Sequence, residues 1–72
     1  MPLVEISLVE GRTPEQLRTL ISEITDVVER NVQAARPSIR VLVRELPKTH
    51  WAIGGETVAD RDAARAAAAT PS

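Results

Sequence analysis

The sequence predicts an α/β (α+β) fold, built as a β-α-β subunit with a short C-terminal hairpin. Two short segments with alternating apolar residues flank a longer segment whose apolar residues recur at helical spacing. A third short segment contains a pair of glycines. Because a full helix separates the first two strands, we expect them to run parallel and to be joined by a right-handed crossover.

The first strand is predicted over residues 3–9. Its apolar side chains alternate with polar ones, which is typical of a strand with one buried face. The side chains expected on that face are Val4, Ile6 and Leu8, and Gly11 ends the strand.

A long amphipathic helix is predicted from Thr13 to about Gln33. Thr13 is the expected N-cap, since Pro14 suits the first helical position and Gln16 completes a capping box. Charged residues lie mainly on the other side of the helix, so one apolar face is expected to pack on the sheet. That face carries Leu17, Leu20, Ile21, Ile24, Val27, Val28 and Val32.

The second strand and a short hairpin follow the helix. Pro37 prevents the helix from continuing, and alternating aliphatic and charged residues then predict a strand that ends before Pro47. Residues 48–58 contain Gly54 and Gly55 and predict a hairpin with its turn at this pair. Such an arm can reach a neighbouring subunit.

One domain is predicted over residues 1–59, followed by an alanine-rich tail over residues 60–72 that we expect to be a frayed helix or disordered. A chain of this size buries only about 60% of its unfolded surface, and a two-stranded sheet is not stable alone. The chain has no cysteine and one histidine, so disulfides and a structural metal are not expected to reinforce it. Assembly with further copies is therefore predicted.

The charge distribution argues against several classes of partner. The formal net charge is -1 and acidic residues are interleaved with basic ones, so no basic surface for nucleic acid is expected. No apolar run approaches the roughly 20 residues that span a bilayer, and no signal peptide is recognisable. We expect a cytoplasmic protein without nucleic-acid or membrane partners.

Pro2 is the first candidate for chemistry, because removal of Met1 would turn its nitrogen from a non-basic tertiary amide into a secondary amine. Ordinary α-amino groups titrate at about 7.7–8.0, and burial or nearby cations lower that pKa further. Such an amine is suited to accept and return a proton near neutral pH. The alternative is that Pro2 only begins an edge strand.

Arg12 and Arg40 are the candidate anion-binding residues, since a guanidinium offers a planar fork of donors that matches a carboxylate. Taken singly, each arginine is more often a solvated charge than a ligand. Trp51, the sole aromatic residue, is expected to be a pocket wall or an interface anchor. His50 has no neighbouring residues at metal-ligand spacing, so no metal site is predicted.

Together these residues resemble the 4-oxalocrotonate tautomerase family of the tautomerase superfamily, whose members have an N-terminal proline. The resemblance covers residues 2–58 and leaves out the alanine-rich tail. It rests on four segments in this order: Met1-Pro2, Val9-Glu10-Gly11-Arg12, Ile39-Arg40-Val41 and His50-Trp51-Ala52-Ile53-Gly54-Gly55.

The resemblance implies a tautomerase-like subunit that pairs into a four-stranded sheet in a dimer, commonly with three such dimers in a homo-hexamer. It also implies an isomerase without cofactor or metal. The reaction would be enol–keto tautomerisation, a 1,3- or 1,5-proton transfer, of a 2-hydroxydienoate or 2-oxo acid such as 2-hydroxymuconate.

The same resemblance implies a role for each site residue. Pro2 would be the catalytic base, and Arg40 from a neighbouring subunit would bind the carboxylate and the 2-oxo group. Arg12 would hold the distal carboxylate. Trp51 would line the pocket, and Val9 would place a backbone group near the substrate.

Two alternatives stay open. Related hydratases and dehalogenases use the same proline, but Val9 and Ile53 stand where those enzymes carry an arginine and a water-activating glutamate. The chain could still be the proline-bearing subunit of such a hetero-oligomer. The second alternative is a non-catalytic oligomeric module that binds an anionic ligand, which retention of Met1 would favour. Aromatic catabolism and biosynthesis both stay open as the setting.

Overall fold

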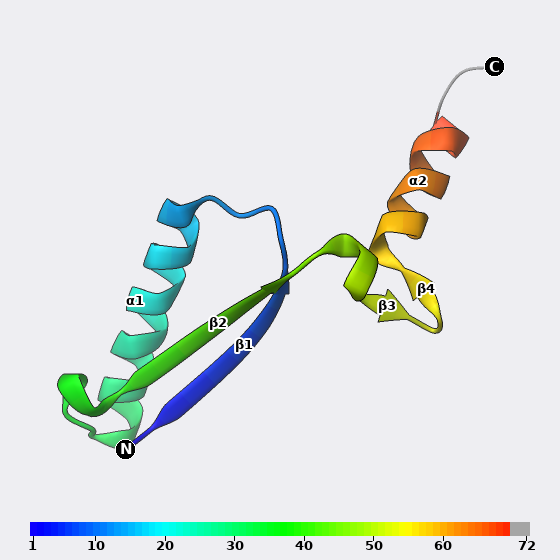
Figure 1. Cartoon of the computed structure of the whole chain (residues 1–72). Coiled ribbons are helices and arrows are strands. Elements are labelled where there is room, and N and C mark those ends of the chain that lie inside the picture. Colours follow the sequence, from blue (N-terminus) through cyan, green and yellow to red (C-terminus); the bar gives the residue numbers. More distant parts are fainter. Residues whose placement is uncertain (70–72) are drawn as a thin grey trace.

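The computed structural model describes residues 1–69 and contains the predicted β-α-β unit and hairpin (Figure 1). The fold class expected from the sequence is confirmed. In chain order the elements are β1 (Leu3–Val9), α1 (Pro14–Val32), the 3-10 helix η1 (Arg36–Ser38), β2 (Arg40–Leu46), the 3-10 helix η2 (Lys48–His50), β3 (Ala52–Ile53), β4 (Glu56–Thr57) and α2 (Val58–Ala69).

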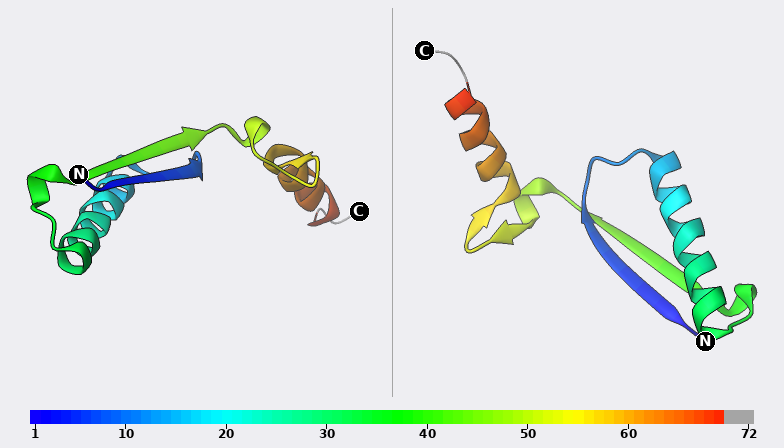
Figure 2. Two further views of the ribbon diagram at one scale, coloured as in Figure 1. Left: turned by 90° about the horizontal axis from the view of Figure 1, so that it is seen from below. Right: turned by 180° about the vertical axis from the view of Figure 1, so that it is seen from behind.

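Strands β1 and β2 form a parallel pair, as predicted. Leu3 lies opposite Arg40 at one end of the pair, and Val9 lies opposite Leu46 at the other. Helix α1 runs along one face of this sheet, and the other face is open (Figure 2). Exposure alternates along both strands, and the half-buried positions of the alternation are Val4, Ile6, Leu8, Val41 and Val43.

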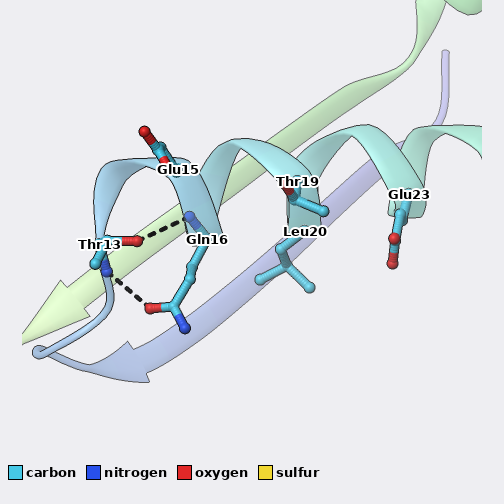
Figure 3. A pocket seen from close by; sticks show the side chains of 6 residues that line it. All are labelled: Thr13, Glu15, Gln16, Thr19, Leu20 and Glu23. Carbon is cyan, nitrogen blue, oxygen red and sulfur yellow. Dashed lines mark hydrogen bonds between the residues drawn. The ribbon is translucent and has the colours of Figure 1, made fainter.

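Helix α1 begins with the predicted capping box. The Gln16 N–H donates to Thr13 Oγ1 at 3.1 Å, and the Thr13 N–H donates to Gln16 Oε1 at 2.9 Å (Figure 3). The helix ends at Val32, because Gln33 adopts a left-handed conformation with φ of 53°. These bounds agree with the helix expected from the sequence.

An ion-pair cluster holds η1 against α1. Arg36 Nη1 lies 2.6 Å from Asp26 Oδ1 and 3.5 Å from Glu29 Oε1. The hydrogen bond with Asp26 raises the pKa of Arg36, and the charge of Glu29 adds to this effect. The short turn before β2 is thereby attached to the C-terminal half of α1.

The C-terminal hairpin turns at the predicted glycine pair. Ala52 lies opposite Thr57, and Gly54 and Gly55 adopt φ of 61° and 88°, which favour glycine. Residues 60–69 of the alanine-rich tail belong to helix α2, while residues 70–72 lie outside the described part of the chain.

A single protomer is less compact than its length would allow. Its radius of gyration is 17.1 Å, whereas a compact chain of this length has about 11 Å. Its accessible surface is 5467 Å², whereas about 4,400 Å² is typical of a monomer of 7.8 kDa. Among the described side chains Val58 alone is buried. The hairpin and α2 project from the end of β2 and do not cover the β1–β2 sheet (Figure 1). Apolar side chains of this subunit therefore stay exposed.

No helix within residues 1–69 combines the length and apolarity needed to cross a membrane.

Candidate active site

The N-terminal edge of the sheet brings Pro2 and Arg40 together. The Arg40 backbone N–H donates to the Pro2 carbonyl at 2.9 Å, which extends the ladder between β1 and β2 by one bond. Pro2 is half-buried, whereas the Arg40 side chain is exposed. Arg40 Nη1 donates to the carbonyl of Pro37 in η1 at 3.0 Å. Pro2 and the guanidinium of Arg40 thus share one edge.

The opposite edge carries Val9 and Arg12. Arg12 Nη1 donates to the Val9 carbonyl at 2.7 Å, and the Arg12 side chain is exposed. Gly11 allows this return of the chain, because its φ of 130° is unfavourable for other residues. A guanidinium has five N–H donors, so Arg12 keeps donors for an anionic ligand.

Trp51 lies beyond the end of β2, between η2 and β3. Its side chain is half-buried, and its carbonyl accepts a hydrogen bond from the Val58 N–H at 2.8 Å. Because β1 and β2 are parallel, their C-terminal ends meet at the same edge. The chain therefore reaches Trp51 from the same end of the sheet that carries Val9 and Arg12.

Within one protomer the five predicted site residues fall into two groups. Strand β1 has 7 residues, and at about 3.3 Å per residue it is roughly 20 Å long. Pro2 at one end and Arg12 at the other are too far apart to contact one small acid. A site that uses both residues must combine protomers.

Two surface hollows lie apart from these residues. One is at the start of α1, where Glu15 and Glu23 oppose binding of an anion (Figure 3). The other is an apolar groove between β1 and α1, lined by Val4, Leu20, Glu23, Ile24, Val27 and Val28. Neither hollow contains a predicted site residue. The apolar lining of the groove favours contact with another protein surface.

No cluster of His, Cys, Asp or Glu within residues 1–69 has the arrangement of a metal site.

Sequence reasoning did not identify two ion pairs that join distant parts of the chain. Asp26 pairs with Arg36 across ten positions, and Lys48 Nζ lies 3.1 Å from Asp62 Oδ2 across fourteen. No local spacing rule relates such positions. The bond from Arg12 to Val9 spans only three positions, so the glycine turn between them was the available signal.

Comparisons with known proteins show that the chain is related to enzymes. Residues 2–61 match the family Tautomerase, described as tautomerase enzyme. The 2-hydroxymuconate tautomerase of Stutzerimonas stutzeri is 44% identical to this chain over 57 residues, which are 79% of this chain and 90% of that protein.

Solved structures agree with the fold. A 4-oxalocrotonate tautomerase isozyme from Methylibium petroleiphilum superposes with a TM-score of 0.84 at 38% identity, over 88% of this chain and 98% of that one. A heterohexamer 4-oxalocrotonate tautomerase from Chloroflexus aurantiacus J-10-fl gives 0.79 at 30% identity, over 83% of this chain and 97% of that one.

Proposed function

The chain belongs to the tautomerase family and is an isomerase of the tautomerase type, and from this premise we propose that Pro2, freed by removal of Met1, is its catalytic base. The proposed substrates are 2-hydroxydienoates and other enol forms of 2-oxo acids. Two observations support this proposal: the family match begins at Pro2, and a relative 44% identical is a 2-hydroxymuconate tautomerase.

The proposed step is a 1,3- or 1,5-proton transfer. The Pro2 amine accepts the proton of the 2-hydroxyl group, the double bonds shift, and the same amine returns the proton to carbon. The electron count of the substrate does not change. The first step needs the neutral amine, which is the form that burial favours over the charged one.

Arg40 from a neighbouring subunit is proposed to bind the carboxylate and the oxygen at C2, on which negative charge develops. Its backbone bond to the Pro2 carbonyl and its side-chain bond to the Pro37 carbonyl support this role, because they hold the guanidinium in place. Donors fixed before the reaction stabilise such charge without reorganisation.

Arg12 is proposed to hold the distal carboxylate of a diacid. The Val9 backbone carbonyl supports this role by anchoring the guanidinium. Trp51 is proposed to form one wall of the pocket.

The assembly that completes this site is proposed to be a hexamer made of three dimers. The separation of Pro2 from Arg12 along β1 supports shared sites. Exposed apolar side chains on both layers also support assembly, among them Leu3, Val27 and Leu42 at 56%, 47% and 48% exposure.

The test combines intact mass with an assay on 2-hydroxymuconate. We expect purified protein to lack Met1 and to convert the enol, and Pro2→Ala to convert it at least about a hundredfold more slowly, since a positioned base contributes 10² or more. Protein that retains Met1 serves as the matched control, because its Pro2 nitrogen is an amide. Equal rates for wild type and Pro2→Ala would refute the base assignment.

A second candidate is the proline-bearing subunit of a hetero-oligomer. The similarity to a subunit of a heterohexamer favours it. It predicts a processed chain that lacks Met1 and is inactive alone, and that gains activity when a second tautomerase-like chain is added.

A further inference from the structure

We propose that helix α2 positions Trp51 through an ion pair between Lys48 and Asp62, and thereby sets how tightly the pocket holds its substrate. This inference rests on the proposed function, which makes Trp51 a pocket wall. Asp62 lies just beyond residues 2–61, which match the family. The alanine-rich extension, which lies mostly outside the family match, would thus act on the site.

The backbone around Trp51 is held from both sides. On its N-terminal side, η2 is closed by the His50 N–H, which donates to the Pro47 carbonyl at 2.8 Å. On its C-terminal side, the Val58 N–H donates to the Trp51 carbonyl at 2.8 Å. Val58 is the first residue of α2 and is buried, so the start of α2 is tied directly to Trp51.

The ion pair closes this segment into a loop. Lys48 is the first residue of η2, and its Nζ lies 3.1 Å from Oδ2 of Asp62, one turn into α2. Trp51 lies between the two partners along the chain. Helix α2 packs on η2, and the ion pair adds a side-chain contact between the two.

The expected effect is modest. The two side chains are 50% and 40% exposed, and ion pairs at such positions change equilibria by about two- to fivefold. Trp51 does not touch the atoms that exchange the proton. Loss of the pair should therefore raise KM for 2-hydroxymuconate by about two- to fivefold and leave kcat nearly unchanged.

The fluorescence of Trp51 tests the positioning directly, because it is the sole tryptophan of the chain. We expect Asp62→Asn and Lys48→Gln to increase quenching by acrylamide. Asp60→Asn is the matched control, since it removes the same charge from the first turn of α2 without touching the pair. Exchange of the two charges, Lys48→Asp with Asp62→Lys, should restore the quenching of the wild type.

The outcomes separate this inference from the proposed function. Quenching that is unchanged in Asp62→Asn, or changed equally in Asp60→Asn, overturns the positioning by the ion pair. Increased quenching with an unchanged KM overturns the effect on the pocket. Absence of turnover in the wild type is a failure of the proposed function, and the quenching series still decides whether the pair positions Trp51.

Discussion

The backbone N–H of Arg40 donates to the carbonyl of Pro2 at 2.9 Å, so Pro2 and Arg40 of one protomer lie at the same edge of the sheet. The guanidinium of Arg40 is in turn held by the Pro37 carbonyl. Arg12 is held by the Val9 carbonyl at the far edge. Two arginines with separate anchors at separate edges are expected to have separate roles.

Substitution of each arginine by alanine should have a different kinetic effect. Arg40→Ala should lower kcat by about 10²–10³, as loss of a donor to a developing oxyanion does. Arg12→Ala should mainly raise KM for the diacid 2-hydroxymuconate and should leave KM for the monoacid phenylenolpyruvate unchanged. Steady-state kinetics on both acids measure the split, and identical behaviour of the two variants would contradict it.

The η1 turn should also influence turnover, because it connects α1 to Arg40. Asp26→Asn removes the negative charge from the 2.6 Å contact with Arg36 and should loosen the turn whose Pro37 carbonyl holds the Arg40 guanidinium. We expect kcat to fall by about two- to fivefold, the scale of an exposed ion pair, with little change in KM.

The control is Glu15→Gln, which removes a charge from the other end of α1. Asp26→Glu should recover part of the lost kcat if the carboxylate acts through Arg36. A change in KM alone, or an equal effect of Glu15→Gln, would show that Asp26 does not position Arg40.

Much of the fold was predictable because its signals are local. The capping box at Thr13 and the glycine pair at 54–55 act within a few residues, and the structure has both. The alternation in β1 likewise matches its exposure pattern. The helical part of the alanine-rich tail was harder to judge, since alanine favours a helix but offers little apolar surface to bury.

The sequence points to candidate site residues but not to their arrangement. The proximity of Pro2 and Arg40 depends on the register that sets Leu3 opposite Arg40, and periodicity does not fix a register between distant strands. The contact between Lys48 and Asp62 depends on the path of the hairpin between them. The way protomers combine Pro2 with Arg12 depends on contacts between subunits, which no local sequence pattern predicts.

The capping box should contribute measurably to stability. Thr13→Ala removes the acceptor of the Gln16 N–H and should destabilise the fold by about 1 kcal/mol, which corresponds to roughly 4–8 °C in Tm for a domain of this size. Thermal unfolding followed by circular dichroism measures this at one fixed protein concentration, because assembly shifts Tm. Thr19→Ala, within the same helix, should cause no such loss, and a comparable drop there would argue against the cap.

The apolar groove between β1 and α1 should be an interface. Val27 is 47% exposed in a single protomer and lines this groove with Ile24 and Val28. Val27→Asp would place a carboxylate in the contact, and burying an unpaired charge costs several kcal/mol. We expect this variant to dissociate, with a smaller native mass in analytical ultracentrifugation.

Dissociation should also abolish activity, because Pro2 and Arg12 of one protomer lie too far apart to serve the same substrate. Ser22→Asp adds the same charge to an exposed position of α1 and should keep both the native mass and the rate. If Val27→Asp kept the mass of the wild type, the groove would not be an interface. If Val27→Asp became monomeric and stayed active, the site would be complete within one chain. The proposal that Arg12 of one protomer binds the substrate at Pro2 of another would then be wrong.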